Sequence, residues 1–169
     1  MILTRDRILA EIAAGNVTVD PYDESAVGPA SIDLHLGDEV RVLDKTGGPV
    51  PIRDDTDYRD GSHTSCLTTP YPLAPGETVL GITRERIKLP PDICGWLEGR
   101  SRFARLGLAI HVTAGFISPG VDNRQVLEIS NLSGRVLELH VGTRICQIIL
   151  QRTEGTAVYR GRFAAQDKP

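Results

Sequence analysis

The chain has few aromatic residues, few cysteines and no long apolar run. Aromatic residues make up 5% of the 169 residues, so the core must be built mainly from Val, Ile and Leu. The three cysteines, Cys66, Cys94 and Cys146, are odd in number and far apart, as is typical of reduced thiols in the cytosol. No run approaches the roughly 20 apolar residues of a membrane span. We therefore expect a cytoplasmic protein with neither a signal peptide nor a transmembrane helix.

The sequence also lacks an excess of charge of one sign. It has 19 Lys and Arg residues against 22 Asp and Glu residues, for a formal net charge of −3. A general nucleic-acid binder normally shows a strong basic excess, so nucleic acid is not an expected partner. A small anionic ligand stays open because it needs only a few local donors.

Several motifs of metal and nucleophile catalysis are absent. No His-x-Glu is followed by Pro-Cys-x-x-Cys, no His-Glu-x-x-His occurs, and the four histidines are scattered, so no catalytic zinc is predicted. A Gly-x-Ser-x-Gly elbow and a Walker phosphate loop are missing too. If the protein is an enzyme, its chemistry must come from carboxylates, hydroxyls and guanidiniums.

The composition predicts a mainly β protein. Seventeen Gly and eleven Pro are spread between short apolar runs, a pattern of short strands joined by turns. One helix is predicted at the N-terminus, with Thr4 as N-cap, an apolar stripe that includes Ile8 and Ile12, and Gly15 as its stop. The region 47–75 is expected to be a long surface loop. Strands are predicted over 31–36, 77–82, 93–98, 108–113, 126–131, 135–140 and 144–151. We expect a single domain over 1–153 and a flexible tail over 154–169.

A second short helix, of about two turns, is predicted between Trp96 and Leu108. Ser101 and Arg105 are four residues apart and would share a face of it. Main-chain N–H groups and the guanidiniums of Arg100 and Arg102 would cluster at its start, which suits phosphate oxygens. A solvated basic turn is the alternative.

Glu128 is the most informative carboxylate. Strand alternation places Leu127 and Ile129 on one face and Glu128 on the other. Glu128 is then either a solvated charge on the outside of a sheet or a carboxylate in a cleft that can take a proton from water. Glu138 has the same local pattern, and periodicity does not choose between them. His111 is predicted to be a packed, hydrogen-bonded core histidine.

Four segments of the chain are Pro29–Gly37, Gly99–Leu108, His111–Ile117 with Pro119–Gly120, and Leu127–Asn131. In this order along the chain they resemble the motifs of the dCTP deaminase family, which belongs with the trimeric dUTPases. Gly142, Ile145, Gln147 and the N-terminal helix add to the resemblance, which spans about residues 1–152. It implies a distorted jelly-roll β-barrel of the dUTPase-like type and a homotrimer with active sites between subunits. It also implies deamination of dCTP to dUTP and ammonia without a catalytic metal, with Mg²⁺ carried on the triphosphate.

The resemblance also implies roles for individual residues. Glu128 would be the general base that activates water for attack on C4 of cytosine and later protonates the departing amine. Arg105 would keep Glu128 ionised, while Ser101 and the Ala114 main chain would position the water and the base edge. The remaining substrate contacts that it implies are Arg100, Arg102, Thr113, Gly115, Phe116, Ser118, Gln147 and Tyr159, with Arg100, Ser101 and Arg102 on the phosphates.

Four departures from the family pattern leave the substrate open. Ser118 replaces an Asp that helps to hold the deoxyribose and, in dUTPases, activates the hydrolytic water. Arg102 replaces a second Ser, Val121 replaces an aromatic residue, and the Tyr159–Phe163 tail segment only partly matches the closure segment. The alternatives are a dUTP diphosphatase or bifunctional enzyme, a deaminase of a modified cytosine nucleotide, and a non-catalytic nucleotide-binding relative.

Overall fold

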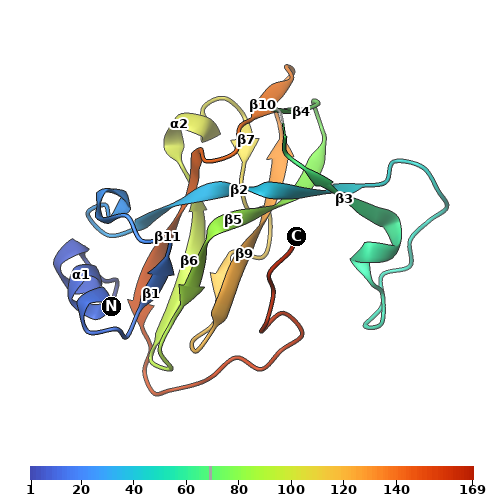
Figure 1. Ribbon diagram of the computed structural model, residues 1–169. Helices are drawn as coiled ribbons and strands as arrows, with labels where there is room; N and C mark the ends of the chain where they lie inside the picture. The colour runs from blue at the N-terminus through green and yellow to red at the C-terminus, as the bar shows by residue number, and fades with distance from the viewer. Residues whose placement is uncertain (69) are drawn as a thin grey trace.

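The computed structural model describes residues 1–68 and 70–169, and strands dominate it (Figure 1). Its helical elements are two α-helices, α1 (Arg5–Ala13) and α2 (Ser101–Ala104), and two 3₁₀ turns, η1 (Glu24–Ala26) and η2 (Tyr58–Gly61). The strands are β1 (Thr18–Asp20), β2 (Ile32–Leu43), β3 (Ser62–Cys66), β4 (Tyr71–Leu73), β5 (Thr78–Lys88), β6 (Ile93–Gly99), β7 (Leu108–Ala109), β8 (Phe116–Ile117), β9 (Asp122–Asn131), β10 (Leu137–Leu139) and β11 (Arg144–Arg152).

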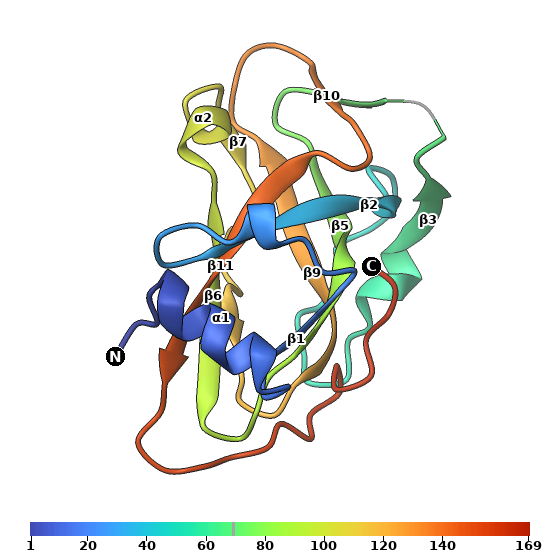
Figure 2. The ribbon, with the colours of Figure 1, turned by 60° about the vertical axis from the view of Figure 1, so that its left-hand side comes forward.

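Nine of these strands form one curled sheet (Figures 1 and 2). Its main path runs β7-β9-β5-β2-β11-β6-β8, with β1 added to β5 and β3 added to β2, while β10 and β4 pair separately. The first and last strands of the path, β7 and β8, are consecutive in the chain. Residues 110–115 therefore pass from one edge of the sheet to the other, and this crossing segment is where the site described below is built.

The core follows from the alternation of apolar residues in the long strands. Leu34 and Leu36 of β2 and Leu127 and Ile129 of β9 are fully buried. Burying each such side chain stabilises the fold by about 1.5–3 kcal/mol, so the inward faces hold the curled sheet together. This confirms the predicted mainly β fold with a core of aliphatic residues.

The N-terminal helix is confirmed, because α1 begins after Thr4 and is followed by Gly15 at φ +73°. The Thr4 hydroxyl donates to the Asp6 carboxylate and makes no capping bond to the main chain. Strands are confirmed at the predicted places for β2, β5, β6, β9, β10 and β11, but β2 and β5 continue to Leu43 and Lys88, beyond their predicted ends, and β9 begins earlier, at Asp122. No helix in the described part of the chain is long and apolar enough to cross a membrane.

Three further predicted boundaries are wrong. The strand predicted over 108–113 ends at Ala109, because the N–H groups of 112–114 bind the Glu128 side chain and no neighbouring strand. The second helix has one turn, since Gly107 at φ +85° follows closely after α2. The region predicted as a loop over 47–75 contains β3, which extends the sheet along β2, and β4, which pairs with β10.

Residues 154–169 run along the bottom of the molecule in Figure 1 and then rise beside the sheet. Hydrogen bonds join this tail to the main body: the Tyr159 N–H donates to the Pro119 carbonyl at 3.0 Å, and the Arg124 N–H donates to the Gln166 carbonyl at 3.2 Å. The Asn123 amide donates to the Phe163 carbonyl at 2.8 Å. The tail therefore lies over the end of β9, and its flexibility stays a prediction.

Candidate active site

The Glu128 carboxylate lies on β9 and faces the crossing segment. It accepts hydrogen bonds from the N–H groups of Val112 at 2.8 Å, Thr113 at 2.7 Å and Ala114 at 3.4 Å. The Thr113 hydroxyl donates to the same carboxylate at 3.1 Å. The Glu128 carboxylate thus accepts the hydrogen bonds that these main-chain N–H groups would otherwise make to a neighbouring strand.

Two opposing effects set the pKa of Glu128. Partial burial raises it, and the hydrogen bonds from Thr113, Val112 and Ala114 lower it further than burial raises it. The pKa therefore lies below its usual value of 4.5, because donors that bind the charged form favour that form. At neutral pH Glu128 is an ionised carboxylate held in a fixed orientation.

Glu128 lines a cavity of about 340 Å³, which we call the Glu128 cavity. The predicted site residues Ala114, Phe116, Ser118 and Tyr159 line it too. Phe116 packs edge-on against Trp96, with ring centroids 5.6 Å apart. Gly115 lies behind this wall, where a Cβ atom would come within 2.8 Å of the His111 ring and 3.1 Å of the Leu97 carbonyl. Only glycine fits there, so the crossing segment can pass close to β6.

His111 differs from its prediction. It lines the Glu128 cavity, and its buried Nδ1 atom has no hydrogen-bond partner among the residues that the structure describes. The predicted hydrogen-bonded core histidine is therefore wrong. The reason is that residues 110–115 leave the sheet, so the ring stands against the cavity wall.

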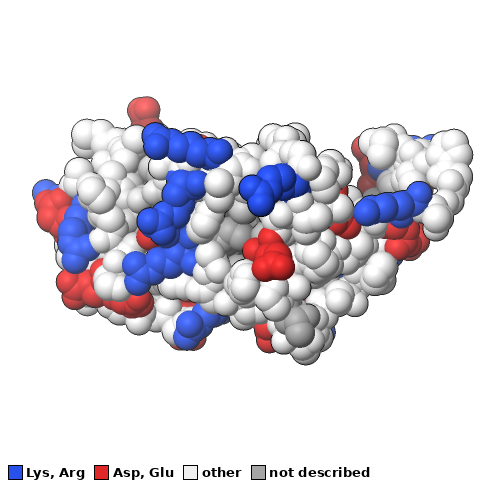
Figure 3. Space-filling view, turned by 90° about the horizontal axis from the view of Figure 1, so that it is seen from above, with Lys and Arg blue, Asp and Glu red and all other residues white. Residues whose placement is uncertain are grey.

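A second pocket, of about 300 Å³, contains the other predicted binding residues, and we call it the Arg100 pocket. Arg100, Ser101, Arg102 and Gln147 line it, together with Asp33 and the residues around Gly28. The Arg100 guanidinium forms an ion pair with Asp33 at 3.1 Å. Figure 3 shows Lys and Arg side chains gathered on the half of the surface over α2 and β11. Two guanidiniums beside main-chain N–H groups suit phosphate oxygens.

The structure does not bring all predicted catalytic residues together within one chain. Ser101 begins α2 and Arg105 directly follows it, one turn away as predicted, with the Arg105 N–H donating to the Ser101 carbonyl at 3.1 Å. In the described part of the chain, no hydrogen bond or ion pair joins Arg105 to Glu128, and no residue lines both the Glu128 cavity and the Arg100 pocket. One chain therefore presents the predicted site as two separate halves.

Sequence reasoning missed two amides in the wall of the Glu128 cavity. Asn123 and Gln125 are buried on β9, and the Gln125 amide donates to the Asn123 side-chain oxygen at 2.6 Å. Both residues line the cavity, as Ser118 does. The signal was available, because alternation puts these two polar residues on the same inward face as Leu127 and Ile129.

The family profile described as "dCTP deaminase-like" matches residues 2–153, which is most of the chain. The chain belongs to the dCTP deaminase-like family. A relative from Mycolicibacterium vanbaalenii, named "dCTP deaminase, dUMP-forming", is 41% identical over 165 residues, covering 93% of this chain and 83% of the relative. A relative with the same name from Parafrankia sp. is 38% identical over 180 residues, covering 100% of this chain and 88% of the relative.

Solved structures show the same fold for this dCTP deaminase-like chain. The 2′-deoxycytidine 5′-triphosphate deaminase from Agrobacterium tumefaciens superposes with a TM-score of 0.72 at 24% identity, covering 90% of this chain. Our chain spans 48% of that longer chain. A mutant dUTPase from phage phi11 of S. aureus superposes with a TM-score of 0.51 at 14% identity, covering 86% of this chain. The predictions of a dUTPase-like fold and of a dCTP deaminase-like enzyme are both confirmed.

Proposed function

We propose that this enzyme deaminates dCTP by hydrolysis, giving dUTP and ammonia. The observation that carries the proposal is the ionised Glu128 carboxylate, held by three N–H groups in a cavity whose wall includes Ala114. A general base must be charged at the working pH and fixed near the proton that it takes. The names of the relatives support dCTP as the substrate.

In the proposed reaction, Glu128 removes a proton from a water molecule as its oxygen attacks C4 of cytosine. The C4–O bond forms, the electron pair of the C4=N3 bond moves onto N3, and Glu128 passes the water proton to N3. Glu128 then takes the proton of the new C4 hydroxyl and gives it to the amine, the C4–N bond breaks, and ammonia leaves as the C4 carbonyl forms. Water and dCTP are consumed, dUTP and ammonia are produced, and Glu128 returns to its ionised form.

The Arg100 pocket would bind the triphosphate. Arg100 and Arg102 carry the positive charge, and Gln147 is held beside them by the Ser31 hydroxyl, which lies 2.7 Å from its side-chain oxygen. Over the described residues, no group of three or more His, Cys, Asp and Glu side chains is placed to hold a metal ion. Mg²⁺ would therefore enter on the phosphate oxygens, as part of the substrate.

The separation of the two halves supports a homotrimer in which each active site combines two chains. The Glu128 cavity of one chain would receive the cytosine ring of the substrate. The α2 region of a neighbouring chain would bring Ser101 and Arg105 to that cavity. Cyclic symmetry repeats this contact three times. In that arrangement Arg105 would further favour the ionised form of Glu128.

A second candidate is an enzyme that continues to dUMP, which the names of the relatives favour. Among the described residues that line the Glu128 cavity, Glu128 alone carries a carboxylate, and position 118 is Ser. Within that cavity no second carboxylate is in place to activate water, and the carboxylate beside the proposed triphosphate pocket, Asp33, is paired with Arg100 at 3.1 Å. This favours dUTP as the final product.

A panel of dCTP, CTP, dCMP, dUTP and 5-modified cytosine nucleotides with Mg²⁺ tests the proposal. Products are separated by chromatography, and ammonia is measured in parallel. We expect ammonia and accumulating dUTP from dCTP. Accumulation of dUMP and pyrophosphate would support the second candidate. Turnover of another cytosine nucleotide alone would indicate a different substrate, and nucleotide binding without turnover would indicate a non-catalytic relative.

A further inference from the structure

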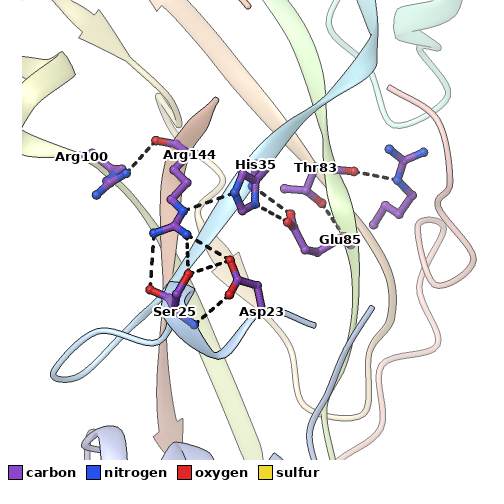
Figure 4. Close-up of polar contacts among 8 residues, drawn as sticks. Asp23, Ser25, His35, Thr83, Glu85, Arg100 and Arg144 are labelled. Carbon is purple, nitrogen blue, oxygen red and sulfur yellow. Dashed lines mark hydrogen bonds and ion pairs between the residues drawn. The ribbon is translucent and has the colours of Figure 1, made fainter. Parts of the chain in front are cut away.

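A buried hydrogen bond between a histidine and a carboxylate connects β2 to β5 close to the Arg100 pocket (Figure 4). The Glu85 carboxylate is 3% exposed and accepts two hydrogen bonds from His35, one from its main-chain N–H at 2.9 Å and one from Nδ1 at 2.5 Å. The Thr83 hydroxyl, also buried, donates to the Glu85 carbonyl at 2.8 Å. A buried carboxylate is costly unless it is bonded in this way, so Glu85 fixes the orientation of the His35 ring.

The other side of the His35 ring faces Arg144 on β11. Arg144 Nε lies 3.4 Å from His35 Nε2. A guanidinium only donates hydrogen bonds, so Nε2 accepts here while Nδ1–H donates to Glu85. The ring is thus a neutral bridge between a carboxylate and a guanidinium. The far end of Arg144 is held by Asp23 at 3.0 Å and by the Ser25 hydroxyl at 2.7 Å.

Arg144 in turn holds Arg100. The Arg100 Nη1 atom donates to the Arg144 carbonyl at 3.1 Å, while Nη2 pairs with Asp33. The ladder between β11 and β2 shifts register between Arg144 and Cys146, and such an irregularity re-aims the groups beside it. The direction of Arg100 therefore depends on where Arg144 lies, and Arg144 is braced by His35.

We propose that His35, supported by Glu85, is a positioning residue for the Arg100 pocket. It fixes the position of Arg144, and through the Arg144 carbonyl it orients Arg100 toward the triphosphate. The inference rests on the proposed function for its substrate. His35 does not line the Glu128 cavity, where the proposed function puts the cytosine ring. Its loss should therefore weaken recognition of phosphate and leave the chemical step unchanged.

Two substitutions at His35 separate positioning from a merely structural role. His35→Leu removes both ring hydrogen bonds. His35→Gln keeps an acceptor that can reach Arg144 and loses only the ring contact with Glu85. His63→Leu is the matched control, because His63 also pairs with a carboxylate, Asp44 at 3.0 Å, but on the exposed β3.

For His35→Leu we expect the KM for dCTP to rise about tenfold while kcat stays within about twofold, since one bracing contact is lost. kcat/KM for deoxycytidine should change by less than about twofold. The substitution weakens only the binding of phosphates, equally in the ground state and the transition state, and deoxycytidine has no phosphate. His35→Gln should recover most of the loss, and His63→Leu should match the unsubstituted chain. Thermal melting checks that each variant is folded.

An unchanged KM for dCTP in folded His35→Leu would overturn the inference, as would an equal loss for deoxycytidine and dCTP. Failure of His35→Gln to recover the KM would also overturn it. Calorimetry with inorganic triphosphate gives a readout that does not depend on deamination. If the unsubstituted chain deaminates nothing, the proposed function fails, yet weaker binding of triphosphate by His35→Leu than by His63→Leu would still support the role of His35.

Discussion

The Glu128 carboxylate receives two hydrogen bonds from Thr113, one from the main-chain N–H at 2.7 Å and one from the hydroxyl at 3.1 Å. This contact joins a sheet strand to a segment that has left the sheet. It fixes the conformation of the crossing segment and at the same time keeps the carboxylate charged. The same hydrogen bonds end the strand and hold the proposed general base in place.

Glu128→Gln should reduce deamination by about 10²–10⁴-fold, because the amide cannot take a proton from water. Nucleotide binding, measured by calorimetry, should remain within about tenfold, since Gln has nearly the same shape. Glu138→Gln is the matched control: Glu138 has the same strand pattern in sequence, but its side chain is 67% exposed. Near-normal turnover by Glu128→Gln would mean that another group is the base.

The pH dependence of kcat/KM should reflect the lowered pKa of Glu128. Activity should be retained as the pH falls to the usual carboxyl value of 4.5 and be lost only below it, as the folded-state pKa is passed. The sign for stability is the same. The ionised form contributes to folding fully above the unfolded pKa, and this contribution is lost as the pH falls through the lowered one. An acid limb well above pH 4.5 that disappears in Glu128→Gln would contradict this assignment.

Ser118→Asp should add a carboxylate to the Glu128 cavity. If position 118 faces the sugar and the adjoining phosphates, dUMP formation from dUTP should rise by about 10²-fold or more, the usual effect of a placed general base. Ser118→Asn, which has the same size and no charge, is the control. Chromatography of dUTP digests measures both variants. If both variants form equally little dUMP, position 118 does not face the sugar.

Mixing inactive variants tests whether two chains build one site. Arg105→Ala and Glu128→Gln should each be inactive alone. After subunit exchange at equal amounts, about a quarter of the sites in a cyclic trimer would combine an intact Arg105 with an intact Glu128 from the neighbouring chain. We expect about that fraction of the original activity. No recovery, with exchange shown by mass spectrometry, would place the whole site within one chain.

Alternation and turn chemistry predicted most of the fold. The stripe of α1 and the inward Leu and Ile residues of β2 and β9 have one dominant partner, the core, so their periodicity is decisive. The prediction of a strand as far as Thr113 was wrong because of a contact that is distant in sequence. The N–H groups of this segment are satisfied by a side chain 15 residues further on, and local pattern does not reveal such a contact.

The sequence predicted which residues gather in the two pockets better than how the pockets are arranged. Glu128, Ala114 and Ser118 do share a cavity, and Arg100, Ser101 and Arg102 do share a pocket. The bracing of Arg100 by Arg144 and His35 joins residues more than 40 positions apart, through a main-chain carbonyl that carries no sequence signal. Such contacts depend on strand register, which sequence alone leaves undetermined.

The hydrogen bonds that hold the tail over β9 use mostly main-chain groups of the tail itself, at Tyr159, Phe163 and Gln166. Main-chain groups are the same in every residue except proline. Two side chains of the tail add to these contacts: the Gln166 amide donates to the Arg124 carbonyl at 3.0 Å, and Arg162 pairs with Asp57 at 2.8 Å. Substitution of its other side chains should change the chemistry displayed at the rim of the cavity while the chain keeps the same course.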